Sequence, residues 1–327
     1  MPEMLLEVKD LQTSFMTKSG VVPAVNRVSF HVAKGETLCI VGESGSGKSV
    51  TSLSIIGLVN QPGKVVGGEI VLEGCNLLEL KPKEMRKIRG NEISMIFQEP
   101  MTSLNPVFTI GSQISESLRT HTRLSKQEAK ARSIEMLKLV GISHPEKVIH
   151  YFPHQLSGGM RQRVMIASAL SCHPKLLIAD EPTTALDVTI QAQIMDLIGQ
   201  LSGTLEMGVI WITHDLGVVA EMADRVAVMY AGEIVEEAYA VDLFDRPLHP
   251  YTIGLMHSLP RMDGYQEELY SIPGTVPHMS QLPKGCAFQS RCPVATTRCM
   301  LDKPELEQVE AGHVVRCFYP GTKGEVL

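Results

Sequence analysis

Short, continuous apolar segments recur along the first three quarters of the chain and alternate with segments of helical periodicity. The apolar segments are rich in Val and Ile and lack the strict apolar–polar alternation of a strand with one solvated face. Continuous apolar strands are typical of a sheet that helices cover on both faces. The pattern from Leu5 to about Ala240 therefore predicts an α/β domain, with strands at 36–42, 93–98, 175–180, 209–213 and 225–230.

The pattern changes to helices between Gln98 and His154. Ser125 and Glu128 have the spacing of a capping box at a helix start, and Gly141 is placed to end that helix. We therefore predict a helical insert, at about residues 99–165, within a first domain that spans residues 1–245.

A second change in composition follows Asp245, where Pro, His and Cys become frequent. Residues 246–327 are predicted to form a small irregular domain. Because a domain of this size has only a small apolar core, its loops need additional cross-links or a metal.

Composition and charge narrow the class of protein. The 327 residues are 44% hydrophobic and carry 30 basic against 36 acidic side chains, a net charge of −6, which argues against a general nucleic-acid binder. The N-terminus MPEMLLEVKD has no apolar stretch of the kind found in a signal peptide, and no run of about 18 apolar residues occurs. The default compartment is the cytosol, where disulfides are rare.

The segment GESGSGKS fits the phosphate-binding pattern G-x-x-x-x-G-K-[ST], between a predicted strand and a predicted helix. Glycines let the backbone curl so that successive N–H groups point at one anion, and the helix that follows adds its positive end. We expect Lys48 to reach the β- and γ-phosphates of a nucleotide and Ser49 to ligate Mg²⁺. The alternative is an ordinary Gly-rich turn. The predicted nucleotide-binding residues here are Gly42, Glu43, Ser44, Gly45, Ser46, Gly47, Lys48, Ser49 and Val50.

Two carboxylates end the apolar strand LLIADE. Ligands of open α/β sheets bind at strand ends, so Asp180 is placed to hold Mg²⁺ and Glu181 to deprotonate an attacking water. An apolar run followed by Asp-Glu is a weak signal by itself, since most such ends are solvated. It becomes a strong signal in a chain that also has the phosphate loop.

The segment LSGGMRQR, Leu156 to Arg163, resembles the signature sequence of ABC-type ATPases. Ser157 can cap a helix there, with the N–H groups of Gly158 and Gly159 beside it, and this makes a second anion-binding helix end. The resemblance implies a head-to-tail dimer in which the signature acts on the ATP held by the other subunit.

Other motifs of that family follow in the family's order. Gln98 matches the glutamine that helps to place Mg²⁺ and water, and Ala185–Asp187 match the D-loop. His214 matches the switch histidine that senses the γ-phosphate, and Phe15 lies where an aromatic usually stacks on adenine. Taken alone, His214 would be interpreted as structural and Phe15 as a core aromatic.

The last part of the chain resembles one branch of the family. HPYTIGLMHSLP, IPGTVP and the cysteines that follow are similar to the C-terminal extension of oligopeptide, dipeptide and nickel importers. The resemblance implies an ATPase on the cytoplasmic side of the membrane that powers peptide import. Its implied partners are two transmembrane permeases, an extracytoplasmic binding protein and a second, related ATPase, with a heterodimer favoured. In importers the segment after Gln98, residues 99–114, receives the coupling helix of the permease.

Two other functions stay open at this point. One is an ATPase of a nickel or other small-solute importer. The other is a soluble regulator in which ATP clamps a DNA or ribosome partner.

Four of the seven cysteines gather near the C-terminus, at Cys286, Cys292, Cys299 and Cys317. Structural zinc sites favour tighter C-x₂₋₄-C pairs, and the common ferredoxin spacings do not match either. Cys292 is followed by Pro, as at some iron–sulfur ligands. The resemblance points to a structural [4Fe–4S] cluster, and zinc is less favoured. The alternative is four unrelated thiols or an adventitious disulfide.

Two further expectations concern these cysteines. Since the four thiols and the phosphate-binding motifs lie in separate parts of the sequence, we expect Cys292→Ser to leave the motifs intact. The other three cysteines, Cys39, Cys75 and Cys172, are interpreted as small core residues.

Overall fold

The structure is a computed structural model of the chain, and it describes residues 3–18, 20–98, 103–183, 188–258 and 270–322. These residues form two compact units, each assembled from separated parts of the sequence. The first unit contains Met1–Leu6, Val32–Glu36 and Leu72–Ile212. The second contains Glu7–His31, Thr37–Val71 and Thr213–Leu327.

Parallel strands form the sheet of the first unit. β6 (Ile93–Ile96) pairs with β7 (Leu176–Asp180), and β7 pairs with β8 (Gly208–Thr213). Every residue of these strands is buried, as the continuous apolar segments predict. The predicted strands at 93–98, 175–180 and 209–213 are therefore confirmed.

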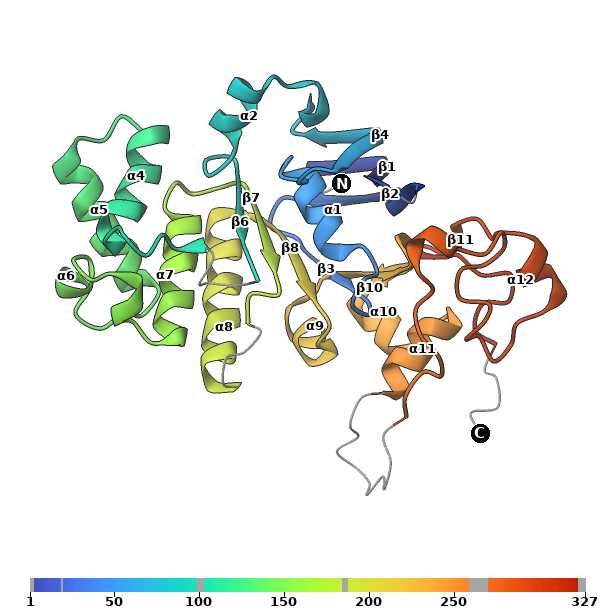
Figure 1. Cartoon of the computed structure of the whole chain (residues 1–327). Helices are drawn as coiled ribbons and strands as arrows, with labels where there is room; N and C mark the ends of the chain where they lie inside the picture. The colour runs from blue at the N-terminus through green and yellow to red at the C-terminus, as the bar shows by residue number, and fades with distance from the viewer. Residues whose placement is uncertain (1–2, 19, 99–102, 184–187, 259–269, 323–327) are drawn as a thin grey trace. The chain divides into compact units, whose positions relative to one another are not determined.

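Helices make up most of the remainder of the first unit. α4, α5 and α7 pack on one another, and α7 also packs on β6 (Figure 1). The bounds are α2 (Pro82–Ile88), α4 (Ile110–His121), α5 (Lys126–Leu139), α6 (Pro145–Val148), α7 (Gly158–Leu170) and α8 (Val188–Leu205), with β5 (Cys75–Asn76) and the 3₁₀ turns η1 (Leu77–Glu79) and η2 (Pro153–Gln155).

The predicted ends of α5 are confirmed. The Ser125 side chain accepts a hydrogen bond from the Glu128 N–H, and the Glu128 carboxylate accepts one from the Ser125 N–H at 2.8 Å. The helix ends before Gly141, which takes the left-handed conformation with φ of 73°.

The second unit contains two groups of strands. β2 (Gly20–Ala33), β1 (Met4–Thr17) and β4 (Gly63–Leu72) are neighbours in that order. In the other group, β3 (Thr37–Val41) runs parallel to β9 (Arg225–Tyr230), which pairs antiparallel with β10 (Glu233–Tyr239). β12 (His313–Val315) pairs with β10, and β11 (Glu307–Glu310) pairs with β12. The last part of the chain thus adds strands to the sheet that contains β3 and β9. The predicted strands at 36–42 and 225–230 are confirmed.

Short helices accompany these strands. They are α1 (Lys48–Ile55), α9 (Leu216–Met222), α10 (Ala240–Asp245), α11 (Pro250–His257) and α12 (Thr297–Leu301), with the 3₁₀ turn η3 (Met279–Gln281). In the described ranges, no helix has both the length and the apolar character needed to cross a membrane.

A buried carboxylate holds the start of the C-terminal extension (residues 246–327) against β10. Glu236 is fully buried and accepts hydrogen bonds from the N–H groups of Leu248 and His249, at 2.7 and 2.8 Å. The His313 ring lies 2.8 Å from the same carboxylate. A buried carboxylate with three donors is satisfied, and its loss would leave those donors unpaired.

The interpretation of the remaining cysteines as core residues holds only in part. Cys39 on β3 is fully buried and Cys172 is half-buried. Cys75 is exposed, so its prediction is wrong. It follows a tight turn in which Glu73 and Gly74 both have positive φ, and this turn leaves the thiol at the surface.

Candidate nucleotide-binding site

The phosphate-binding loop lies in the second unit, between β3 and α1. Gly42 and Gly47 have φ of 149° and 104°, which residues other than glycine rarely adopt. A Cβ atom at Gly42 would lie 2.2 Å from the Met229 carbonyl oxygen, and one at Gly47 would lie 2.6 Å from the Ala24 oxygen. Glycine is therefore required at both positions by conformation and by space.

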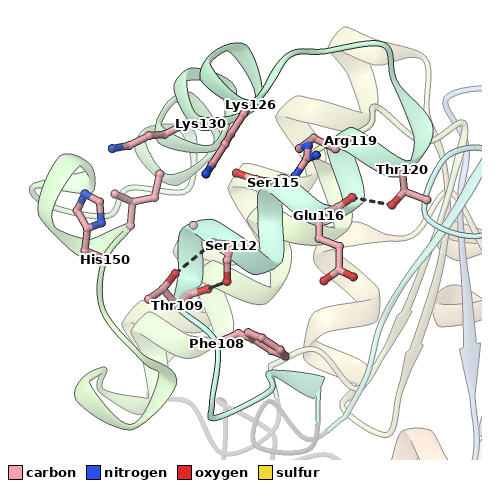
Figure 2. Close-up of a pocket in the computed structure, with 12 residues that line it drawn as sticks. Phe108, Thr109, Ser112, Ser115, Glu116, Arg119, Thr120, Lys126, Lys130 and His150 are labelled. Atoms are coloured by element: carbon pink, nitrogen blue, oxygen red, sulfur yellow. Dashed lines mark hydrogen bonds between the residues drawn. The ribbon is translucent and has the colours of Figure 1, made fainter.

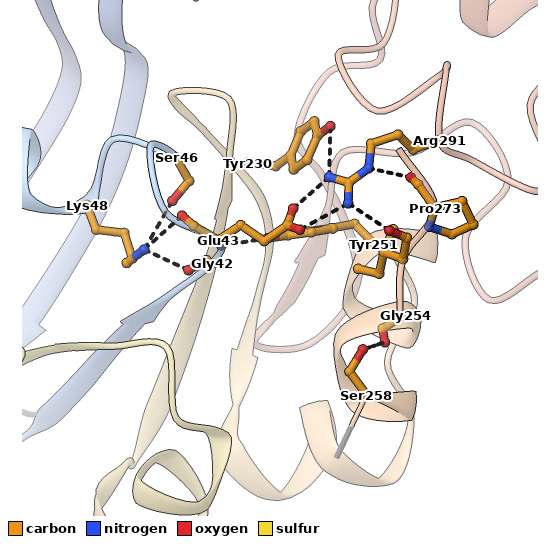
Figure 3. A network of polar contacts seen from close by, with 11 residues as sticks. Gly42, Glu43, Ser46, Lys48, Tyr230, Tyr251, Gly254, Ser258, Pro273 and Arg291 are labelled. Carbon is orange, nitrogen blue, oxygen red and sulfur yellow. Dashed lines mark hydrogen bonds and ion pairs between the residues drawn. The ribbon is translucent and has the colours of Figure 1, made fainter. Parts of the chain in front are cut away.

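The Lys48 ammonium lies inside this loop. The side chain is 6% exposed, and its Nζ donates to the carbonyl oxygens of Gly42 at 2.6 Å and Glu43 at 3.0 Å (Figure 3). Lys48 is also the first residue of α1, so the N–H groups in the first turn of this helix point toward the phosphate loop. A full positive charge and a positive helix end in one loop make a strong site for phosphate.

Two predicted catalytic residues meet in the first unit. Gln98 follows β6 and Glu181 follows β7, and because these strands are parallel neighbours both side chains lie at one edge of the sheet. The Gln98 Nε2 donates to the Glu181 carboxylate at 2.8 Å. Glu181 has a positive φ of 47°, a strained conformation for this residue type that is common at functional sites. Asp180 is the last residue of β7 and is buried.

The signature forms the start of α7, also in the first unit. Ser157 is the N-cap, and its hydroxyl accepts a hydrogen bond from the Met160 N–H at 3.3 Å, as the sequence predicts. A Cβ atom at Gly158 would meet open space, and Ser157 and Gly158 are exposed. The helix start is thus open to a ligand or a partner.

The remaining predicted residues lie in the second unit or outside the described residues. His214 follows β8 and is exposed, and Phe15 on β1 is half-buried beside Gly63. The predicted D-loop, Ala185–Asp187, lies outside the described residues.

Sequence reasoning missed an ion pair at the phosphate loop. Arg291, from the C-terminal extension, donates to both carboxylate oxygens of Glu43 (Figure 3). The phenol of Tyr251 accepts a hydrogen bond from the Glu43 backbone N–H at 2.8 Å. The only signal in the sequence is the acidic residue within GESGSGKS, because a carboxylate in an anion-binding loop needs a partner. The cysteine-rich segment therefore contacts the phosphate loop through Arg291, the residue before Cys292. The expectation that Cys292→Ser leaves the phosphate motifs intact stays a prediction.

The four C-terminal cysteines line one small cavity, together with side chains such as His249 and Phe288. All seven cysteines of the chain, each within the described ranges, are free thiols. Burial, together with the neighbouring thiols, raises the pKa of Cys292 and of Cys317 to about 11. Within the part of the chain that the structure describes, no three His, Cys, Asp or Glu side chains form a group that could hold a metal ion.

A pocket of about 730 Å³ lies in the first unit between α4 and α5 (Figure 2). Its lining combines an exposed aromatic ring, Phe108, with the basic side chains Arg119, Lys126 and Lys130. Glu116 supplies the carboxylate in this lining. The pocket therefore offers an apolar contact and an excess of positive charge.

Comparison with known proteins places these features in one family. Residues 25–184 match the family model described as ABC transporter, and residues 235–299 match the one described as Oligopeptide/dipeptide transporter, C-terminal region. The chain is 56% identical to the oligopeptide transport ATP-binding protein AppD of Bacillus subtilis (strain 168), covering 96% of both chains. It is 52% identical to the dipeptide transport ATP-binding protein DppD of Haemophilus influenzae, covering 97% of this chain and 96% of that one.

Solved structures agree with this placement. A dimeric bacterial ABC transporter cassette is 30% identical and superimposes with a TM-score of 0.66, over 72% of this chain and 99% of that one. The same identity and TM-score hold for a dimeric post-hydrolysis state of such a cassette bound to ADP and phosphate. The α/β fold is therefore that of the ABC-type P-loop ATPases. The chain belongs to the family of ATP-binding proteins of oligopeptide and dipeptide ABC transporters.

Proposed function

We propose that this chain is the ATP-hydrolysing subunit of a peptide importer, and that it powers the uptake of di- or oligopeptides through partner permeases. The observation that carries the proposal is the combination of a full-length match to peptide-transport ATPases with a match of the extension to the peptide-transporter model. A nickel or small-solute importer would share the ATPase motifs, but four relatives that are 52 to 56% identical to this chain are all named for peptides.

Each motif has a proposed role in the hydrolysis of ATP. Lys48 binds the β- and γ-phosphates, and Phe15 stacks on the adenine. Glu181 is the general base for the attacking water, and its hydrogen bond from Gln98 supports a role for both in placing that water. His214 contacts the γ-phosphate. The same roles require Glu181 to be ionised and Gln98 to be able to release it.

Mg²⁺ is the proposed metal of the nucleotide, with ligands from Ser49, Asp180 and Gln98. Hydroxyl, carboxylate and amide oxygens are the donors that this ion prefers, so the residues fit it. When bound, the ion neutralises charge that develops on the phosphates. The position of Asp180 at the carboxyl end of β7 supports its assignment, because ligands of open α/β sheets bind at the carboxyl ends of the strands.

A head-to-tail dimer of ATPases is the proposed working form. The exposed start of α7 presents the N–H groups of Gly158 and Gly159 beside Ser157, and a second anion-binding helix end of this kind suits the nucleotide of another subunit. The similar cassettes of known structure are dimeric. We favour a heterodimer with a related ATPase.

The pocket between α4 and α5 is the proposed docking site for a cytoplasmic segment of a permease. Phe108, in its lining, and the adjacent Val107 are 51% and 70% exposed, an apolar pair that an assembled partner would cover. Since Arg119, Lys126 and Lys130 outnumber Glu116 in the lining, the segment that docks is expected to carry a carboxylate. Docking there places the ATPase on the cytoplasmic side of the membrane. An extracytoplasmic peptide-binding protein completes the system.

The four-cysteine cavity is the proposed site of a structural [4Fe–4S] cluster. All four thiols line the one cavity, and the donor set fits such a cluster in number and chemistry. Each cysteine of a cluster ligates a different iron, so the four sulfurs need not meet at a single ion. Anaerobic purification followed by assays for iron and acid-labile sulfide tests this. About four of each per chain is the expected result, whereas stoichiometric zinc would identify a zinc site instead.

Uptake by cells tests the transport function. Cells whose chromosomal copy is deleted are complemented with the wild type or with Glu181→Gln, and the uptake of labelled tripeptide and of Ni²⁺ is measured. We expect the wild type to restore peptide uptake and the variant to fail. Restoration of Ni²⁺ uptake without peptide uptake would favour the small-solute alternative.

A further inference from the structure

The Arg291–Glu43 pair joins the C-terminal extension to the phosphate-binding loop (Figure 3). Arg291 Nη1 lies 2.6 Å from one carboxylate oxygen of Glu43, and Nη2 lies 3.0 Å from the other. This is the bidentate geometry in which a guanidinium binds a carboxylate most strongly. Both residues belong to the second unit, although 248 positions separate them in the sequence.

The guanidinium is held on every side. Its side chain is only 3% exposed. Nε donates to the Pro273 oxygen at 2.8 Å, Nη2 to the Ile272 oxygen at 3.3 Å, and Nη1 to the Tyr230 hydroxyl at 3.4 Å. With the two bonds to Glu43, all five N–H donors of the arginine have an acceptor. The extension thus supplies a fixed positive charge, and not a flexible surface side chain.

Glu43 presents an electrostatic difficulty for the loop in which it lies. Glu43 follows Gly42 in the segment whose pattern is typical of polyphosphate binding. Like charges within a few ångströms repel, so an unpaired Glu43 would oppose nucleotide binding. Arg291 neutralises that charge, while Tyr251 holds the backbone N–H of the same residue.

We propose that Arg291 is a positioning residue of the nucleotide site, through which the C-terminal extension sets the affinity of the phosphate loop for ATP. The proposal rests on the ATPase function given above and extends it, because it gives the extension a part in nucleotide binding. Arg291 acts through Glu43 and does not itself need to touch ATP.

A double-mutant cycle on the full-length chain tests the proposal. ATP dissociation constants are measured by calorimetry for the wild type, Arg291→Met, Glu43→Gln and the double variant. Loss of this partly buried, charged hydrogen-bond pair is expected to weaken ATP binding about tenfold in Arg291→Met. In the Glu43→Gln background the same substitution is expected to have little effect, because no charge remains to be neutralised.

A second readout comes from ATP hydrolysis with the partner subunits present. We expect Arg291→Met to raise KM for ATP and to leave kcat near that of the wild type, since the catalytic residues lie elsewhere. The matched control is Arg298→Met. Arg298 likewise precedes a cysteine of the extension, but it is exposed and its guanidinium lies 3.9 Å over the Phe318 ring. ATP affinity in this control should equal that of the wild type.

The outcomes distinguish a positioning role of Arg291 from a packing role, and both from a failure of the ATPase function. An equal loss of affinity in both Glu43 backgrounds would show that Arg291 only supports the packing of the extension, and an unchanged affinity in Arg291→Met would also overturn the proposal. If Arg291→Met does not fold, Arg291→Lys provides the test. Lysine keeps the charge but loses the bidentate geometry. Arg291→Lys is therefore expected to weaken ATP binding about threefold, and only where Glu43 is present. A wild type that neither binds nor hydrolyses ATP would refute the ATPase function instead.

Discussion

Glu181 combines a strained backbone with a side-chain hydrogen bond to another predicted catalytic residue. It takes a left-handed backbone conformation at the end of a buried strand, and its carboxylate accepts a hydrogen bond from Gln98. A strained residue with a fixed side chain is pre-organised for chemistry rather than for stability. This geometry supports the proposal that Glu181 is the general base.

We predict that Glu181→Gln binds ATP with the affinity of the wild type but hydrolyses it 10²- to 10⁴-fold more slowly, on the order of the loss of a positioned base. Nucleotide binding and steady-state hydrolysis are measured with the partner subunits present. Glu206→Gln is the control, because Glu206 has the same left-handed conformation in the same unit. Wild-type turnover in Glu181→Gln would rule out the role.

At this scale, the sequence predicts the residues whose chemistry is local. The glycines of the phosphate loop and the cap at Ser157 follow from spacing, because backbone conformation and helix capping depend on neighbours in sequence. Arg291 could not be predicted, since its partner Glu43 is distant in sequence and the pairing depends on how the extension folds.

Among helices and strands, too, some can be predicted from local sequence and others cannot. The buried strands β3, β6 and β7 follow from continuous apolar segments, and α5 follows from its capping box and Gly141. The short elements of the extension, β11, β12 and α12, have no periodicity of their own. Their position depends on contacts such as those of Glu236 with Leu248 and His249, and such contacts leave no local pattern.

The start of α7 yields a prediction about assembly. Ser157→Arg should abolish hydrolysis while the isolated chain still binds ATP, because the signature acts on the nucleotide of the other subunit in the proposed head-to-tail dimer. Ser125→Arg is the matched control, since Ser125 caps α5 in the same manner. The control costs about 1 kcal/mol of helix stability but should leave hydrolysis intact. If ATP binding by the lone chain falls as far as turnover does, the head-to-tail arrangement is wrong.

The pocket between α4 and α5 yields a prediction about the permease. Phe108→Ala should weaken the complex with the permeases about tenfold or more, as expected for an aromatic contact at an interface. ATP affinity of the isolated chain should not change. Leu139→Ala, at an exposed apolar residue of α5, is the control. The measurement is the affinity of the detergent-solubilised permeases for each variant, and equal affinities for Phe108→Ala and the wild type would place the docking site elsewhere.

At the scale of the whole chain, the C-terminal extension is bound to the ATPase part by specific contacts. Its strands pair with β10, its backbone is held by Glu236, and its Arg291 reaches Glu43. A segment that appears in the sequence as an appendage thus adds strands to the sheet that contains β3 and contacts the loop that follows β3. Sequence alone indicates two separate domains here because composition changes sharply near residue 246.

Cys292→Ser tests this connection. Since Cys292 is adjacent to Arg291, we predict that the substitution lowers the midpoint of thermal unfolding and also weakens ATP binding. This differs from the expectation based on sequence alone, which leaves the phosphate motifs intact. Cys172→Ser, at a half-buried thiol of the first unit, is the control. A loosened extension with unchanged ATP affinity would show that the extension and the loop are independent.

The most direct test of the peptide-importer account is ATP hydrolysis by the complete system in proteoliposomes. The chain is reconstituted with its two permeases and its partner ATPase, and hydrolysis is measured with the binding protein, first without and then with peptide. The account predicts that peptide stimulates hydrolysis, that labelled peptide accumulates on the side of the membrane where the ATPases lie, and that Glu181→Gln abolishes both. Hydrolysis that ignores peptide, with no accumulation of it by the wild-type system, would contradict the account.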